Sequence, residues 1–303
     1  MSFSRSHRNS YGLFRQGIST AARRPRLVGL LYGVNLVAGF IVTVPIYLAL
    51  NSATATTGFS SELATQFDIV LWADVLEDAL PTLVGLFSQL FWIFPVVLLW
   101  KAVASIGIIV TLYSRGLQSF WQGVGEYSGR AIVLALAFLV PVAALGVGIA
   151  ISVFILSAIW PGEVGGFWIF VVFIPVSLVI GLSVLDLMHD YARMELVIGT
   201  KTVGKSVLRG VLWPFRHFNS IGLYAGWFVI ALILLSVPTM IDVRTGGLWG
   251  VFILQQLFLF ARAGVTVAWF GSEIELYDTA LMGELPAIAR VEAEPGFAEK
   301  NQP

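Results

Sequence analysis

Long apolar runs dominate the pattern of hydrophobic and polar positions along the chain. About 20 apolar residues are needed to cross roughly 30 Å of hydrocarbon as a helix. Six runs meet this requirement: residues 27–50, 82–113, 131–160, 167–188, 218–241 and 248–270. The second and third are long enough to tilt or to project beyond the bilayer. The pattern therefore predicts an all-α, polytopic membrane helix bundle with six transmembrane helices.

The runs divide the chain into three parts. Residues 1–26 are expected to form a basic cytoplasmic or interfacial segment, residues 27–283 the six-helix transmembrane domain, and residues 284–303 a disordered cytoplasmic tail. The first run is longer than the 7–15 apolar residues usual in a signal peptide, and no small-residue cleavage site follows it. We therefore expect it to be an uncleaved membrane helix.

Composition supports the membrane class and excludes others. The chain is 57% hydrophobic and 12% charged, against about 25% charged in soluble proteins, so a soluble enzyme is excluded. The formal net charge of zero favours no nucleic acid partner. Because the chain has no cysteine, disulfides, thiolate metal sites and cysteine nucleophiles are excluded as well.

The basic residues lie mainly on one side of the predicted bundle. Those on one side, near the ends of the runs, are Arg5, Arg8, Arg15, Arg23, Arg24, Arg26, Arg115, Arg130, Arg193, Lys201, Lys205, Arg209, Arg216, Arg290 and Lys300. The opposite side holds only Arg244. Since short cytoplasmic loops are enriched in Lys and Arg, both termini are expected in the cytoplasm, with the protein in the cytoplasmic (inner) membrane.

Two basic stretches have the pattern of interfacial helices. Lys201, Lys205 and Arg209 recur every four residues, with Val203, Val207 and Val211 on another stripe. Near the N-terminus, Arg15 and Arg23 accompany Tyr11, Phe14 and Ile18. Attraction to anionic lipid is worth about 1 kcal/mol per basic side chain. The candidate interfacial lipid contacts are Arg15, Arg23, Lys201, Lys205 and Arg209; ordinary positive-inside anchoring is the alternative.

The segment 51–81 carries acids without a base. Apolar residues in it recur near helical spacing, at Phe59, Leu63, Phe67, Leu71, Val75 and Leu76, beside Glu62, Asp68, Asp74, Glu77 and Asp78. This pattern predicts an acidic amphipathic helix on the outer face.

A shift of 193 residues superposes 17–45 on 210–238 without a gap. The identities are Gly17/Gly210, Arg23/Arg216, Gly29/Gly222, Leu30/Leu223, Gly33/Gly226, Ala38/Ala231, Val44/Val237 and Pro45/Pro238. The repeated unit would be a basic interfacial helix followed by an outward and a returning span. Residues 116–129 with the third and fourth spans would be a middle copy, which makes three parallel hairpins. Inverted repeats are more usual in transporters, so this arrangement disfavours a carrier.

The stretch from Asp190 to Val197, the basic helix after it and the stretch from Leu254 to Arg262 resemble a pattern in uncharacterised six-span bacterial membrane proteins. That group is similar in layout to the membrane domain appended to some glycerophosphodiester phosphodiesterases. The resemblance covers about the C-terminal 120 residues. It implies no hydrolase activity and assigns no catalytic residue, because the chain has no room for the soluble phosphodiesterase barrel.

Charges inside the runs are the main functional lead. Lys101 and Arg262 lie well within apolar runs, Asn35 lies at a similar depth, and Asp186 is the nearest acid. A charge near the bilayer centre costs about 2.5–3.5 kcal/mol on insertion scales and needs a partner or water. If these helices converge, Lys101, Arg262, Asn35 and Asp186 form a cytoplasm-facing pocket for an anion or lipid head group. The alternatives are structural pairing of Arg262 with Asp186, snorkelling of Lys101, or a proton or ion path.

Other chemistry has weaker signals. His189 and Asp190 are adjacent and could poise a general acid or base, although neighbouring helical residues point about 100° apart. His7 and His217 have no metal-ligand spacing. No catalytic residue, metal ligand or cofactor is assigned.

Two functional interpretations remain. The first is a non-catalytic subunit, scaffold or assembly factor of a cytoplasmic-membrane complex, with the lipid bilayer, anionic lipids and other membrane proteins as partners. The second is a transporter or lipid-handling protein that uses the pocket. A membrane enzyme is disfavoured, since only Asp186, His189, Asp190 and Glu195 offer acid–base groups near one interface.

Overall fold

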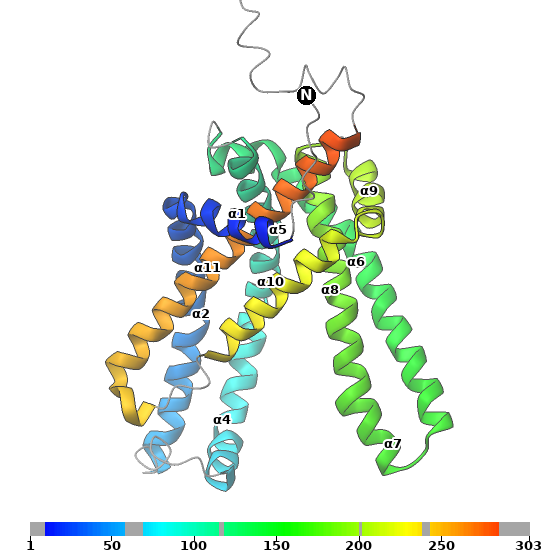
Figure 1. Cartoon of the computed structure of the whole chain (residues 1–303). Helices are drawn as coiled ribbons and strands as arrows, with labels where there is room; N and C mark the ends of the chain where they lie inside the picture. Colours follow the sequence, from blue (N-terminus) through cyan, green and yellow to red (C-terminus); the bar gives the residue numbers. More distant parts are fainter. Residues whose placement is uncertain (1–9, 58–68, 115–117, 200–201, 238–242, 285–303) are drawn as a thin grey trace, which may run out of the picture. The chain divides into compact units, whose positions relative to one another are not determined.

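The computed structural model describes residues 10–57, 69–114, 118–199, 202–237 and 243–284 (Figure 1). These residues are almost entirely helical and contain no strand. The chain divides into two compact units. The first comprises residues 1–20, 102–227 and 268–303, and the second comprises residues 21–101 and 228–267. Each unit is described by itself below.

Six helical segments among the described residues are long and apolar enough to cross a membrane. They are Pro25–Ser52, Pro95–Tyr113, Phe120–Ile159, Glu163–Val197, Asn219–Ser236 and Gly250–Leu281. The prediction of an all-α, multi-pass membrane protein is therefore confirmed.

The helices of the first unit extend further than the apolar runs. α6 (Phe120–Ile159) has 40 residues, or about 60 Å at 1.5 Å per residue, which is twice the thickness of the hydrocarbon layer. It starts at a capping box in which Ser119 accepts from the Gln122 backbone N–H at 3.2 Å. The continuous helical segment Glu163–Val197 is also longer than a single crossing requires. Part of each helix must therefore lie beyond the bilayer.

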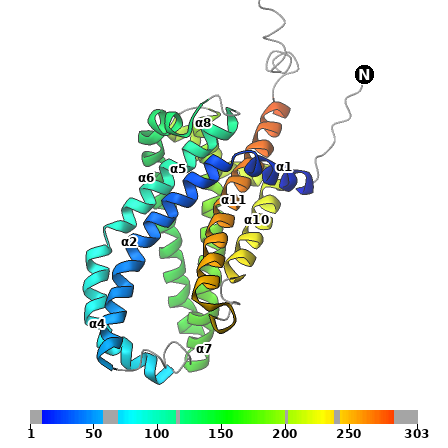
Figure 2. The same cartoon turned by 90° about the vertical axis from the view of Figure 1, so that its left-hand side faces the viewer.

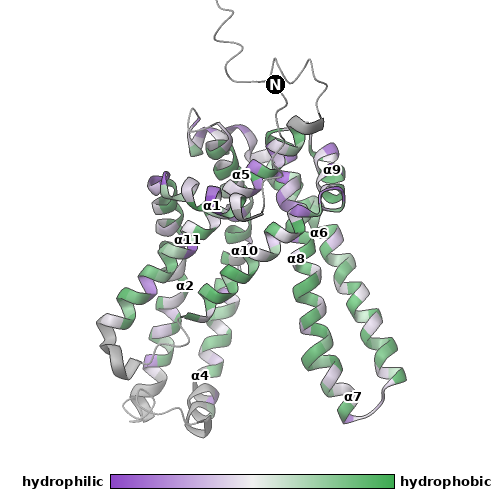
Figure 3. Ribbon diagram, viewed as in Figure 1, coloured by the Kyte–Doolittle hydropathy of each residue, from purple (hydrophilic) through white to green (hydrophobic). Residues whose placement is uncertain are grey.

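α6 and α8 (Ile174–Val197) form a hairpin that is joined by α7 (Glu163–Phe167) and the π-helix η1 (Trp168–Phe173) (Figure 1). Gly162 makes the turn with a φ of 105°, a conformation that favours glycine. Most of the hairpin is apolar on its surface, as the green ribbon in Figure 3 shows. Phe154 is 78% exposed there, as expected of a surface that contacts lipid.

The buried core of the first unit lies at the other end of this hairpin. We call this part the collar: the described residues 10–20, 102–114, 120–138, 186–197, 203–227 and 268–284. It contains α1 (Ser10–Ala22), α9 (Val203–Arg216) and the ends of α5 (Ile93–Tyr113), α10 (Asn219–Ser236) and α11 (Val243–Glu284). The largest of its fully buried side chains are Ile106, Ile109, Leu134, Tyr191, Met194, Leu196, Leu223, Trp227, Glu273 and Tyr277. The collar is thus the packed part of the unit, whereas the rest of the hairpin is exposed.

Three glycines in the collar sit at close helix crossings. Gly17 of α1 lies against Ala268 and Ser272 of α11. Gly123 of α6 lies against Val110 of α5, and Gly210 of α9 lies against Ala192 of α8. A Cβ atom at any of the three would overlap the facing helix. In each case the start of one predicted hairpin packs on the returning helix of another, which is compatible with the predicted repeat; the repeat stays a prediction.

The helix breaks agree with the repeat too. α1 ends at Ala22 and α2 (Pro25–Thr57) follows, while α9 ends at Arg216 and α10 starts at Asn219. Under the shift of 193 residues the two breaks coincide to within one residue.

In the second unit, α2 and α4 (Ile69–Leu90) lie side by side (Figure 2). Ala49 and Leu83 form a small buried core, covered by Ile46, Leu50 and Leu86. Within the same unit, Tyr32 of α2 donates to the side-chain oxygen of Gln256 on α11 at 2.7 Å. This polar contact joins two spans.

Some predicted boundaries change. The run expected over 82–113 is divided at Phe91 and Trp92 into α4 and α5, so it is not one helix. The predicted acidic helix is present from Ile69 onward; its earlier part lies outside the described residues, as do Lys201 and the tail 285–303.

Candidate functional site

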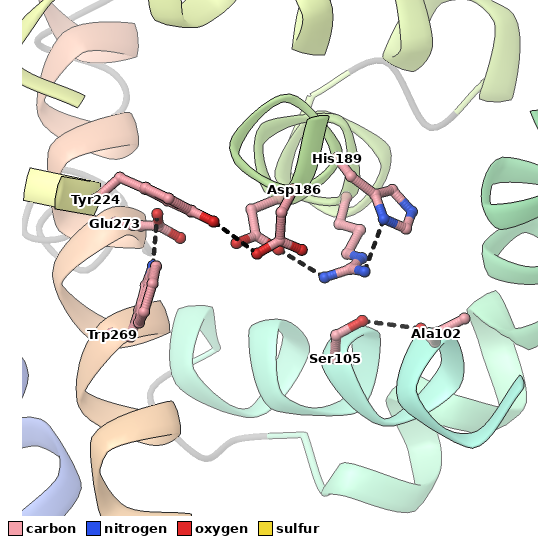
Figure 4. A network of polar contacts seen from close by, with 9 residues as sticks. Ala102, Ser105, Asp186, His189, Tyr224, Trp269 and Glu273 are labelled. Atoms are coloured by element: carbon pink, nitrogen blue, oxygen red, sulfur yellow. Dashed lines mark hydrogen bonds and ion pairs between the residues drawn. The ribbon is translucent and has the colours of Figure 1, made fainter. Parts of the chain in front are cut away.

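A cluster of polar side chains occupies the collar, and four of its members lie on one face of α8. His189 and Asp190 follow Asp186 by three and four residues and precede Arg193 by four and three, a spacing that brings the four together on a helix. Arg193 Nη1 donates to Asp190 Oδ1 at 2.6 Å. Its other terminal nitrogen, Nη2, lies 2.8 Å from His189 Nδ1. Arg193 therefore bridges an acid and a histidine of its own helix (Figure 4).

The bond to Arg193 fixes the state of His189. A guanidinium has only donors, so His189 Nδ1 accepts and the ring proton lies on Nε2. The ring also stacks on Phe138 of α6, with 4.5 Å between the ring centroids. Both the accepting nitrogen and one face of the imidazole are therefore engaged in contacts within the collar.

α10 and α11 supply the rest of the cluster. The Tyr224 hydroxyl donates to Asp186 Oδ2 at 2.9 Å, and Trp269 Nε1 donates to Glu273 Oε1 at 2.8 Å. The rings of Tyr224 and Trp269 meet edge to face, with 4.8 Å between their centroids. Figure 4 shows these side chains converging from α10 and α11 on the face of α8 that carries Asp186.

Acids outnumber bases in this cluster. Asp186, Asp190 and Glu273 interact electrostatically with one another and with the single guanidinium of Arg193. Glu273 is 0% exposed, and its Oε2 has no hydrogen-bond partner among the described residues. A buried acceptor left without a bond costs about 1–3 kcal/mol. Glu273 Oε2 and Arg193 Nε are thus the buried atoms of the cluster that lack a hydrogen bond among the described residues.

Glu195 joins three helices a turn further along α8. Its carboxylate accepts from Arg209 Nη1 of α9 at 2.9 Å and from the Tyr277 hydroxyl of α11. Glu195 itself is buried, whereas the Arg209 side chain is 60% exposed. Gly199 lies directly over this carboxylate, since a Cβ there would come within 2.6 Å of its oxygens. The arrangement fastens α9 and α11 to the end of α8.

A further polar contact seats α1. Trp227 Nε1 of α10 donates to Ser272 Oγ of α11 at 2.7 Å. Phe14 of α1 covers Trp227, with 5.2 Å between the ring centroids, and its ring tip lies against Gly226. A side chain at Gly226 would displace Phe14, so the glycine is needed for this packing.

The four residues predicted to form an anion pocket are divided between the units. Asn35, Lys101 and Arg262 belong to the second unit and Asp186 to the first. All four are exposed at the protein surface. Asp186 is hydrogen-bonded by Tyr224. The convergence of the four residues remains a prediction.

The predicted lipid contacts are partly located. Arg15 on α1, Arg23 after it, and Lys205 and Arg209 on α9 are exposed. On α9, Val203, Val207 and Val211 are half-buried, whereas Leu208, Leu212 and Phe215 are exposed.

The sequence identifies several polar residues of the cluster but not the residues that hydrogen-bond to them. His189, Asp190 and Glu195 were candidates for acid–base chemistry, but Arg193 was counted only as a loop charge. The spacing of Arg193 from His189 and Asp190 on a predicted helix was a sufficient signal. No local signal points to Tyr224 or Tyr277, since their partners are 38 and 82 residues away. Glu273 lies four residues after Trp269, a spacing that predicts this contact on a helix.

No group of three or more His, Cys, Asp or Glu side chains suited to a metal ion occurs within the described ranges. Comparison of the chain with protein-family models, curated proteins and solved structures found no match in any of the three.

Proposed function

We propose that this integral membrane protein is a non-catalytic subunit, scaffold or assembly factor of a membrane complex. The observation that supports this proposal is the use of charge in the collar. Asp190 is paired with Arg193, and Glu195 with Arg209 and Tyr277. The Asp190–Arg193 pair lies within α8, and the Glu195 contacts join α8 to α9 and α11, so these groups are engaged in contacts inside the collar. A catalytic acid or base would need to reach a substrate instead.

The hydrogen-bonding capacity of His189 is also used within the collar. The one nitrogen with a free lone pair in the neutral ring accepts from Arg193, so it is not available as a general base. His189 therefore serves in packing α8 against α6, through its contacts with Arg193 and Phe138.

The proposed orientation places the collar and both termini in the cytoplasm of a cell with an inner membrane. The support is the side on which Lys and Arg concentrate: Arg15, Arg23, Lys205, Arg209 and Arg216 are all exposed on or next to the collar helices. In this orientation the α6–α8 hairpin crosses the bilayer and exposes an apolar surface to lipid or to helices of a partner protein.

Native mass spectrometry after gentle extraction from the protein's own membrane tests this function. The samples are the wild type, Lys101→Ala/Arg262→Ala, and Arg24→Ala/Arg26→Ala as a control that removes two basic residues from the same unit. A stoichiometric protein partner retained by all three is the expected result. A chain that carries only lipid or small molecules in the wild type contradicts the proposal.

A transporter or lipid-handling function is the second candidate, and one observation favours it. Asn35, Lys101, Asp186 and Arg262 are exposed although they lie within apolar spans, and a charge there requires water, a head group or a partner. In the experiment above, an anionic lipid or metabolite bound by the wild type and the control but lost from Lys101→Ala/Arg262→Ala supports this candidate. The resemblance to phosphodiesterase membrane domains adds no activity to either proposal.

A further inference from the structure

α9 presents three different faces around its axis. Ser206, Gly210, Trp213 and Pro214 are buried. Lys205, Arg209 and Arg216 are exposed on a second face, and Leu208, Leu212 and Phe215 are exposed on a third. At 100° per residue the basic face lies between the buried and the apolar faces. An exposed apolar face directly beside a basic face is the pattern of a helix at a membrane surface.

The buried face holds α9 in a fixed rotation. Gly210 lies against Ala192 of α8, and Trp213 packs on Tyr277, with 4.6 Å between ring centroids. Arg209 is additionally paired with Glu195. Because these contacts hold α9 in place from one side, its basic and apolar faces are both exposed. A ligand can bind them without first ordering the helix.

The exposed apolar face continues to the next membrane span. Leu208 is 63% exposed, Phe215 53%, and Phe218 in the short link after α9 is 72% exposed. α10, which is long and apolar enough to cross a membrane, starts at Asn219. α9 therefore ends within three residues of a chain segment that enters the bilayer, which keeps the apolar face at the level of the lipid.

The charge of α9 indicates which kind of membrane surface it binds. α9 contains Lys205, Arg209 and Arg216 and no acidic residue. Arg209 is already opposed by the buried carboxylate of Glu195. Lys205 and Arg216 have no such ion pair with any residue that the structure describes, so they carry the charge available on this face. Phosphate groups of anionic phospholipids, next to acyl chains, offer the complement of both faces.

We propose that α9 is a docking surface for anionic phospholipid of the surrounding bilayer. Lys205 and Arg216 contact the lipid phosphates, while Leu208, Leu212, Phe215 and Phe218 enter the boundary between head groups and acyl chains. This surface is a property of the collar and is independent of the proposed role in a complex, since it requires no protein partner.

Insertion of the apolar face is tested with a fluorescent label. The chain has no cysteine, so Leu208→Cys in the full-length protein takes a single polarity-sensitive probe. A matched control carries the probe at Thr202→Cys, an exposed position just before α9 that lies away from the apolar face. In nanodiscs that contain phosphatidylglycerol, we expect the probe at position 208 to be quenched by lipids labelled in the upper acyl chain and protected from aqueous iodide. Equal access of iodide to both probes overturns the proposal.

Head-group recognition is tested by the lipid that remains bound. Full-length protein is reconstituted into nanodiscs of equal phosphatidylglycerol and phosphatidylcholine, and the lipids retained by the protein are counted by native mass spectrometry. Each basic side chain at an anionic surface contributes about a fivefold preference. We therefore expect enrichment of phosphatidylglycerol by the wild type and at least a fivefold loss of that enrichment in Lys205→Ala/Arg216→Ala.

The matched control keeps the charge. Lys205→Arg/Arg216→Lys should retain the enrichment, which separates loss of charge from loss of fold, and gel filtration checks that all three proteins remain monodisperse. Equal retention of the two lipids by the wild type, or unchanged enrichment in the alanine variant, overturns the assignment of α9.

Discussion

The carboxylate of Glu195 on α8 accepts a hydrogen bond from the guanidinium of Arg209 on α9 at 2.9 Å. The two ends of this bond differ in environment, since the Glu195 side chain is 4% exposed and that of Arg209 60%. Tyr277 of α11 donates to the other oxygen of the same carboxylate. One buried acid thus ties two helices to a third, at the point where the sequence after Val197 leaves α8.

Because Glu195 is buried and Arg209 is exposed, alanine substitutions at the two positions should lower stability by different amounts. Arg209→Ala leaves a buried carboxylate with one of its donors lost, whereas Glu195→Ala removes the hydrogen bonds to both Arg209 and Tyr277 and opens a cavity. We expect Arg209→Ala to lower the free energy of unfolding by about 1–3 kcal/mol, because a buried acceptor loses a donor. Glu195→Ala should lower it further, because it removes two hydrogen bonds and leaves a cavity. Thermal unfolding in detergent, followed by tryptophan fluorescence, measures both, and Glu77→Gln on exposed α4 is the neutral control. A larger loss from Arg209→Ala than from Glu195→Ala would show that the carboxylate is not the centre of this contact.

The Asp190–Arg193 pair is buried on both sides, with side-chain exposures of 7% and 12%. Arg193→Gln should therefore reduce the folded yield strongly, because it leaves the Asp190 carboxylate without its cation, a loss of about 3–5 kcal/mol for a buried pair. Asp190→Asn in the same chain removes the orphaned charge and should restore part of the yield. Fluorescence-detected gel filtration compares the single and double variants. Independent, additive losses in the double variant would contradict direct pairing.

Removing the charge of Glu273 should not lower stability, in contrast to the Arg193 variant. Its Oε1 accepts from Trp269, and a glutamine oxygen can accept the same bond. The group at Oε2 would then be an amide that lies near the acids Asp186 and Asp190 instead of a further carboxylate oxygen. We expect Glu273→Gln to leave the Tm unchanged or raise it. A drop of several degrees would mean that the carboxylate itself is required, and Trp269→Phe is the control that removes the donor.

The three glycine crossings make a prediction with a control on each helix. Gly17→Ala, Gly123→Ala and Gly210→Ala place a methyl group against a facing helix, so each should destabilise the collar by about 1–3 kcal/mol through overpacking. Gly12, Gly125 and Gly204 lie on the same three helices with nothing within 4 Å of an added Cβ. Alanine at these positions should be neutral or stabilising by up to about 1 kcal/mol, from its helix propensity. The Tm of the six variants measures these effects. A similar fall in Tm for the close-crossing glycine and the control glycine of the same helix would argue against the close crossing.

The hydrophobic pattern predicted the membrane class and the six spans because lipid-facing helices need about 20 apolar residues irrespective of their neighbours. It underestimated α6, α8 and α11, since the extra turns of these helices are polar or mixed and are stabilised by packing in the collar. It also missed the break at Phe91 and Trp92, because these side chains are as apolar as the helices on either side.

The candidate chemistry was predictable only where it is local. Asp186, His189, Asp190 and Arg193 share a face of one helix, and their spacing alone brings them together. The pairs Tyr224–Asp186 and Tyr277–Glu195 depend on how α10 and α11 cross α8, which no spacing in the sequence encodes. The exposed apolar face of α9 depends on tertiary packing in the same way, because α9 packs with Gly210 against Ala192 of α8 and this leaves Leu208, Leu212 and Phe215 exposed.

The most direct test of the proposed function is the mass of the particle that contains this protein when it is extracted from its own membrane into polymer-bounded lipid discs without detergent. Released by native mass spectrometry, the wild-type chain of 33.0 kDa should appear together with at least one other protein at a fixed integer ratio. Collar variants that fold normally, such as Gly204→Ala, should retain the partner. A wild-type particle that releases the 33.0 kDa chain with lipids alone, at every extraction condition that keeps it folded, would contradict the account.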